Sequence, residues 1–326
     1  MCALYGIHDY GDYFNSRQKN IIMAVLSMES ETRGIDATGI SYVHDNRLQI
    51  YKRPIPAHKM RYNVPEKVKV IMGHTRMTTQ GNEKKNENNH PFFGRVKNNT
   101  FSLAHNGILH NDSFLRQSMN LPKTNIETDS YIAVQLIEKE NAVTFDSLRK
   151  MAETVVGSFV FTVLDKHNNL YFVRGDNPIC VYHFADRGFY LYASTEEILQ
   201  SSLVRLGIDK WYSHRVPIDT GDILRINRIG DIDKAKFQVT EYYHLYYGYY
   251  SRYDYDWNTV PEKDNKYNDD YREYLAILKQ TAQSYGYTGK DIDDMIAEGW
   301  SLVDIEQIIY EDDLYDDEII YERMEV

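Results

Sequence analysis

Four apolar segments follow one another from Gly157, separated by short polar breaks, and they constrain the fold more than any other feature of the chain. They read SFVFTVLD, NLYFVRG, ICVYHF and GFYLYAS, and each is rich in the β-branched and aromatic residues that strands favour. Helical periodicity precedes this run at residues 17–32, 127–140 and 144–154, and follows it at 195–206. We therefore expect an α+β fold in which two antiparallel sheets pack together with helices outside.

The N-terminal half adds further strand-like segments at residues 2–8 and 68–75. ATGISYVHD and RLQIYKR are expected to form a hairpin across a tight Asp45-Asn46 turn. The segment TFSLAHNG, residues 100–107, is predicted to be a strand that runs into a turn. A second hairpin is expected within DILRINRIGDI.

The amino-acid composition changes after residue 240, first to a Tyr-rich and then to an acidic segment. We predict one large domain over residues 2–245, a Tyr-rich linker at 246–261, and an acidic helical appendage at 262–326. The tyrosines suit either a packed linking segment or a partner-binding patch, because the ring is apolar and the hydroxyl is not. A Gly-Tyr-Thr-Gly sequence at 286–289 breaks the helical pattern of the appendage. Its expected core residues are Trp300, Ile305 and Ile309.

Composition excludes several classes of function. The formal net charge of -11 argues against a nucleic-acid surface. The first 20 residues have no basic start and no apolar core, and no stretch approaches the roughly 18 apolar residues of a membrane helix, so we expect a cytoplasmic protein without membrane contact. The two cysteines, Cys2 and Cys180, make neither a disulfide framework nor a four-cysteine zinc site.

Cys2 is a candidate nucleophile because it directly follows the initiator Met1. If an aminopeptidase removes Met1, Cys2 carries both a thiol and a free α-amine. That amine has an ordinary pKa of about 7.7–8.0, so it can act as a base near neutral pH. Nucleophile and base would then sit on one residue. A second-position cysteine is also often incidental, so other residues must decide.

An ordered series of motifs favours Cys2 as a nucleophile over an incidental cysteine. The series, joined to the N-terminal CALYGI, resembles the class II glutamine amidotransferases of the N-terminal-nucleophile (Ntn) hydrolase superfamily, over roughly residues 2–225. The resemblance implies a four-layer αββα sandwich of two antiparallel sheets and a C–N hydrolase that needs no cofactor and no metal. The motifs are RGIDATGI (33–40), GHTRMTTQG (73–81), NHPF (89–92), LAHNGILHN (103–111) and TDSYI (128–132).

Three motifs carry the groups that hydrolysis of a glutamine amide requires. In the resembled family, the positions of Asn106 and Gly107 form the oxyanion hole, although Asn-Gly alone also suits a hairpin turn. The position of Arg76 binds the α-carboxylate of glutamine, as guanidinium groups do through two hydrogen bonds. Asp129 matches the anion that binds the α-ammonium; in isolation, Arg76 would be read as a surface ion pair and Asp129 as a residue near a helix cap.

Other motif residues are expected to support the site. Thr79 is predicted to bind substrate or the polar stretch 81–90, a candidate loop that closes over glutamine. Arg33 and Asp36 are predicted to brace the nucleophile. His74 and His105 are interpreted as buried structural histidines. Met77 departs from the family, where an aromatic residue often follows the GHTR arginine, so the mode of coupling to a partner is open.

Residues 240–326 contain no motif of the synthase domains to which relatives join this domain, so a stand-alone glutaminase is expected. It would donate ammonia to a separate synthetase or ligase. Two alternatives stay open: a free γ-glutamyl amide hydrolase, or a catalytically silent binding protein on the same fold. Basal activity that rises with a partner would favour the first, full activity alone the second, and binding without turnover the third. The ammonia acceptor, the oligomeric state and the removal of Met1 cannot be read from the sequence.

Overall fold

The computed structural model describes residues 2–239 and, further on, residues 275, 278, 279, 282, 283, 286–298, 300, 302 and 305. The chain divides into two compact units, Met1–Tyr250 and Ser251–Val326. No helix in the described ranges is both long and apolar enough to cross a membrane.

Two antiparallel sheets form the first unit. The first sheet has the order β11-β9-β10-β1-β4-β2-β3, and the second has the order β13-β12-β8-β7-β6-β5. The first contains β1 (Ala3–Asp9), β2 (Ala37–His44), β3 (Arg47–Arg53), β4 (Val70–Arg76), β9 (Cys180–Phe184), β10 (Phe189–Ala193) and β11 (His214–Arg215). The second contains β5 (Phe92–Val96), β6 (Asn99–Leu109), β7 (Gly157–Asp165), β8 (Leu170–Arg174), β12 (Asp222–Ile226) and β13 (Ile232–Lys236).

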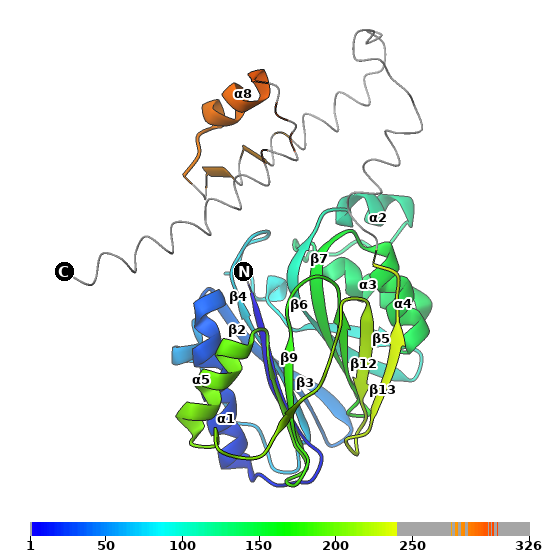
Figure 1. Cartoon of the computed structure of the whole chain (residues 1–326). Coiled ribbons are helices and arrows are strands. Elements are labelled where there is room, and N and C mark those ends of the chain that lie inside the picture. Colours follow the sequence, from blue (N-terminus) through cyan, green and yellow to red (C-terminus); the bar gives the residue numbers. More distant parts are fainter. Residues whose placement is uncertain are drawn as a thin grey trace, which may run out of the picture. The chain divides into compact units, whose positions relative to one another are not determined.

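Helices cover the outer faces of both sheets, which confirms the predicted αββα sandwich (Figure 1). Two helices, α1 (Ser16–Glu29) and α5 (Glu196–Leu206), pack on the first sheet. Two more, α3 (Tyr131–Glu140) and α4 (Phe145–Thr154), pack on the second. The remaining helical segments of this unit are α2 (Asp112–Ser118), η1 (Ser30–Arg33), η2 (Ala57–Lys59) and η3 (Asn86–Asn88).

Alternation along the strands explains the layers. In β1, Ala3, Tyr5 and Ile7 face the α1–α5 layer, while Leu4 faces the second sheet. Successive side chains of a strand point to opposite faces, so a central strand buried on both faces must be apolar throughout. Strand β7 behaves alike, with Phe161 in the α3–α4 layer and Val160 between the sheets. The central strands are therefore buried and packed on both faces, and the candidate site residues lie at their ends.

The local predictions have mixed outcomes. The Asp45-Asn46 turn is confirmed, with φ of 48° and 57° joining β2 to β3. The predicted turn at Asn106-Gly107 is wrong, because β6 continues to Leu109 and Gly107 pairs with Phe159 in β7. Long-range pairing overrides the local turn signal here.

The described part of the second unit is a small helical cluster. Helix α8 (Gly289–Ala297) begins at a capping box formed by Thr288 and Asp291, which fits the predicted break at 286–289. Ile305 is fully buried with Leu278, Ala282 and Ile292, as expected for a core residue. Trp300 is 47% exposed, so its assignment to the core is wrong. Ile309, residues 246–261 and the other predicted parts of the appendage lie outside the described residues.

Candidate active site

Cys2 lies at the start of β1, beside the end of β4. Strands β1 and β4 pair antiparallel with Ala3 opposite Thr75, so Cys2 lies beside the end of β4 and the residues that follow it. The Sγ atom of Cys2 donates to the carbonyl of Met77 at 3.5 Å. From η1, Nε of Arg33 donates to the Cys2 carbonyl at 3.0 Å. The first described residue is thus fixed on two sides.

Arg76 ends β4 with its guanidinium held by the loop that follows. The residue is only 3% exposed. Nη1 donates to Oδ1 of Asn89 at 2.7 Å, and Nη2 donates to the carbonyls of Gln80 at 2.5 Å and Gly81 at 3.4 Å. Burial lowers the pKa of Arg76. A carboxylate that binds both Nη atoms must share or replace these acceptors.

Asp129 is buried between β6 and the start of α3. Oδ2 accepts from the backbone N–H of Leu109 at 2.6 Å, and Oδ1 accepts from the Ser130 hydroxyl at 3.1 Å. The backbone N–H of Asp129 donates to Oε1 of Gln80 at 3.1 Å. These bonds orient a fixed carboxylate, as recognition of an ammonium group requires.

Asn106 carries a buried amide that its surroundings do not satisfy. The residue is fully buried, and neither Nδ2 nor Oδ1 has a hydrogen-bond partner within residues 2–239. Buried amides normally find partners, so an unpaired one is a candidate for binding a ligand. Its backbone carbonyl is held separately by Nδ2 of Asn177 at 3.0 Å.

Gly107 follows with a backbone that only glycine adopts readily. Its φ is +145°, and a Cβ atom would lie 1.9 Å from the carbonyl oxygen of Ser158. This geometry explains why β6 can pass close to β7 at the unsatisfied amide.

Hydrogen bonds between the two sheets bring these strands together. His74 precedes Arg76 by two residues and pairs with Leu4 in β1. Its Nε2 lies 3.0 Å from the carbonyl of His105 in β6, so Nε2 carries the proton. Asn106 therefore follows at the point where β6 faces β4 and the neighbouring β1.

Burial and neighbouring charges both affect the ionisation of Cys2. Burial of the sulfur raises the pKa of the Cys2 thiol, although the residue is partly exposed. The Met77 carbonyl bond and the Arg76 charge lower this pKa, while Asp129 raises it. A thiol with a raised pKa is mostly protonated at pH 7, so it requires a base before it can attack.

The supporting residues differ in how they are placed. Asp36 accepts from the backbone N–H of Thr78 at 2.7 Å and donates its own N–H to the Arg76 carbonyl at 3.0 Å. It therefore shapes the turn after β4. Thr79 is exposed, and within the described residues its side chain makes no hydrogen bond.

The histidines of the site motifs, His74, His90 and His105, are buried and neutral. Burial lowers the pKa of His74 to about 3 and lowers the pKa of His105 and His90 as well. Nδ1 of His105 lies 2.8 Å from the Ser130 hydroxyl, which in turn donates to Asp129. These residues support the site's structure, as expected for His74 and His105.

Sequence reasoning missed the residues that anchor the polar loop 81–90. Asn88 and Glu127 exchange two hydrogen bonds, of 2.8 Å and 2.9 Å. Lys52 donates to the carbonyl of Asn89, whose side chain holds Arg76. The stretch has no apolar periodicity that could reveal these contacts; the NHPF motif alone pointed to Asn89.

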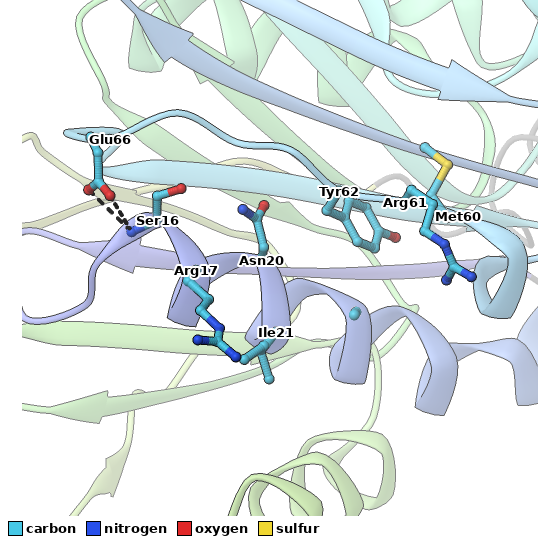
Figure 2. Close-up of a pocket in the computed structure, with 9 residues that line it drawn as sticks. Ser16, Arg17, Asn20, Ile21, Met60, Arg61, Tyr62 and Glu66 are labelled. Atoms are coloured by element: carbon cyan, nitrogen blue, oxygen red, sulfur yellow. Dashed lines mark hydrogen bonds between the residues drawn. The ribbon is translucent and has the colours of Figure 1, made fainter.

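A cleft of about 470 Å³ lies elsewhere, between α1 and residues 60–66 (Figure 2). Arg17, Asn20 and Ile21 line one side, and Tyr62 and Glu66 line the other. None of the predicted site residues line this cleft. The described residues contain no cluster of histidine, cysteine or carboxylate side chains that could hold a metal ion.

Comparisons with known proteins show which proteins the chain is similar to. Residues 74–201 match a family model described as "Glutamine amidotransferase domain". Glutamine–fructose-6-phosphate aminotransferase (isomerizing) of Staphylococcus epidermidis is 29% identical over 190 residues, and that of Streptococcus agalactiae is 28% identical over 192 residues. Each match covers 56% of this chain and 30% of the relative, so the chain spans less than a third of these relatives' length.

Solved structures share the fold. Glutamine phosphoribosylpyrophosphate amidotransferase from B. subtilis aligns with a TM-score of 0.57 at 20% identity, over 73% of this chain and 50% of that chain. A structure titled as the allosteric regulatory enzyme of purine biosynthesis aligns with a TM-score of 0.59 at the same identity and coverage.

Proposed function

We propose that the chain is a class II glutamine amidotransferase of the Ntn hydrolase superfamily, and that it hydrolyses the side-chain amide of L-glutamine with Cys2 as nucleophile. The observation that carries the proposal is the unpartnered amide of Asn106, buried where β6 faces β4. An oxyanion needs a donor already aimed at it and free of other partners. Nδ2 of Asn106 has no other partner within residues 2–239, so we propose it as the first donor, with the backbone N–H of Gly107 as the second.

Substrate selection is proposed to rest on the two fixed charges. Arg76 would bind the α-carboxylate and Asp129 the α-ammonium, with Thr79 as a further contact from the turn after β4. Both charged groups are buried and oriented by neighbours, so little side-chain entropy is lost when glutamine binds. Arg33 and Asp36 hold Cys2 and the turn at Met77 in place.

The chemistry follows from a buried thiol that needs a base. Once Met1 is removed, the α-amine of Cys2 takes the proton of the thiol while sulfur attacks the carboxamide carbon. Asn106 and Gly107 stabilise the negative oxygen of the tetrahedral intermediate. The intermediate collapses with transfer of the proton to nitrogen, ammonia leaves, and a γ-glutamyl thioester remains on Cys2. Water, deprotonated by the same amine, then releases glutamate and restores the thiol.

The destination of the ammonia is a separate part of the proposal. We assign hydrolysis to residues 2–245 and propose that ammonia passes to a separate synthetase or ligase, with residues 246–326 available for docking. A free γ-glutamyl amide hydrolase is the alternative, and the exposed Met77 directly after β4, where relatives often place an aromatic residue, keeps that alternative open.

The test measures glutamate and ammonia release from L-glutamine by untagged protein whose loss of Met1 is verified by intact mass. Cys2→Ala and Cys2→Ser should lack turnover, while the matched control Cys180→Ser should retain it, because Cys180 is buried in the α1–α5 layer. Equal turnover by Cys2→Ala and the unchanged protein would overturn the assignment. Full activity without a partner would favour the free hydrolase over the ammonia donor.

A further inference from the structure

Among the described residues, Gln80 is the one that hydrogen-bonds both to the guanidinium of Arg76 and to the backbone of Asp129. Its backbone carbonyl accepts from Nη2 of Arg76 at 2.5 Å. Its side-chain Oε1 accepts from the backbone N–H of Asp129 at 3.1 Å. Arg76 and Asp129 are 53 residues apart in sequence, and Gln80 links them with its backbone carbonyl on the Arg76 guanidinium and its side-chain oxygen on the Asp129 backbone.

The rest of the surroundings hold each group separately. Asn89 holds only the guanidinium, and Leu109 and Ser130 hold only the carboxylate. Loss of the Gln80 side chain therefore leaves each charge with its own partners. What it removes is the link that sets the separation between them.

We propose that Gln80 is a positioning residue that fixes the distance between Arg76 and Asp129, and so selects substrates that carry both an α-carboxylate and an α-ammonium. The inference rests on the proposed function, because it assigns those two groups to the two ends of glutamine. Its physical basis is preorganisation: a doubly charged ligand gains full affinity only when both partners are already at the matching separation. Gln80 itself contacts neither the sulfur nor the amide.

A substrate that lacks one α-group separates this role from a general effect on folding. The compound 4-carbamoylbutanoate is glutamine without its α-amino group, so it binds Arg76 but leaves Asp129 unused. Gln80→Met keeps the length of the side chain and removes the acceptor. Gln80→Glu keeps an acceptor oxygen for the Asp129 N–H. Gln117→Met is the matched control, since Gln117 is an exposed glutamine on α2.

The experiment measures kcat and KM on both substrates for the four proteins. One partly exposed hydrogen bond is worth about fivefold to tenfold in binding, so Gln80→Met should raise the KM for L-glutamine by about that factor with kcat within about twofold. Turnover of 4-carbamoylbutanoate should change by less than about twofold, since it does not depend on the separation. Gln80→Glu should restore most of the preference for L-glutamine, and Gln117→Met should match the unchanged protein.

Two results would overturn the inference while leaving the proposed function intact. Equal losses on both substrates would make Gln80 a general support of the loop. No loss on either would show that the link has no effect on binding. Absence of turnover by the unchanged protein, with Met1 removed, would instead refute the proposed function and the inference with it.

Discussion

Replacing Asn106 by leucine should separate the catalytic role of its amide from its contribution to the fold. Leucine has the same branched skeleton but no polar atoms. In the protein as it stands, Nδ2 and Oδ1 are buried without a partner in residues 2–239. If the amide exists for the oxyanion, its removal destroys activity without harming stability.

The expected magnitudes follow from that geometry. A buried polar group without a partner destabilises the folded state by about 1–3 kcal/mol, so its removal should stabilise the fold. The methyl groups of leucine are larger than the amide groups, and crowding by them should offset part of this stabilisation. We expect the free energy of unfolding to stay constant or to rise by up to about 2 kcal/mol, which corresponds to a Tm increase of up to about 6 °C. Loss of one oxyanion donor should lower kcat by about 10²–10³.

Asn88 supplies the matched control. It is equally buried, but Nδ2 donates to the Asn82 carbonyl and to Glu127, and Oδ1 accepts from the Glu127 N–H. Asn88→Leu breaks these bonds and should cost about 2–4 kcal/mol. Thermal unfolding of both variants and glutamate release by both give the comparison. The reasoning fails if Asn106→Leu melts as low as Asn88→Leu, or if it keeps its kcat.

Three further perturbations have signs that the structure determines. Gly107→Ala should cost about 3 kcal/mol or more and abolish turnover, because φ is +145° and the new Cβ meets a β7 carbonyl; an unchanged Tm would contradict this. Burial lowers the pKa of Lys52 from 10.5 to about 8. Between these two pH values the unfolded chain binds more protons than the folded chain does. The free energy of unfolding, relative to that of Lys52→Met, should therefore increase with pH by about 1–3 kcal/mol. Denaturation of both proteins at pH 7 and 10 measures the difference, and a decrease would refute the sign. Lys19 and Asp9 form a buried ion pair with 2.9 Å between Nζ and Oδ2. Lys19→Met should lower the free energy of unfolding by about 3–5 kcal/mol, and adding Asp9→Asn should recover part of that loss. Equal Tm values for the single and double variants would contradict the pairing.

Local patterns were sufficient for the fold because its strands are short, apolar and consecutive. Residues 2–8 are mostly apolar without a break, as a strand buried on both faces requires, so their strand character can be read directly from the sequence. The hairpin at Asp45-Asn46 has its own turn residues, and it formed as predicted.

The same local reasoning failed where distant residues decide the structure. Asn106-Gly107 has the composition of a turn, yet it pairs in register with Val160 and Phe159 of β7, more than 50 residues away. Trp300 has the apolar character of a core residue, but it remains half exposed. Neither outcome has a signal in the neighbouring sequence.

The site shows the same division. Arg76, Asn106 and Asp129 could be selected from the sequence because they stand in an ordered series of motifs that resembles the class II glutamine amidotransferases. Gln80 and Asn89, which orient Arg76, act through hydrogen bonds in a polar loop. Such bonds follow no periodicity, so only the folded structure identifies these residues.

Covalent trapping tests the central claim, that Cys2 is the nucleophile, most directly. The protein, with Met1 removed, is incubated with 6-diazo-5-oxo-L-norleucine, a glutamine-analogue electrophile, and the modified residue is located by intact mass and peptide mapping. We predict a single adduct on Cys2, slowed by L-glutamine and by Arg76→Ala, with Cys180 unmodified. An adduct that forms elsewhere, or no adduct on Cys2 in protein with a free N-terminal cysteine, would contradict the account.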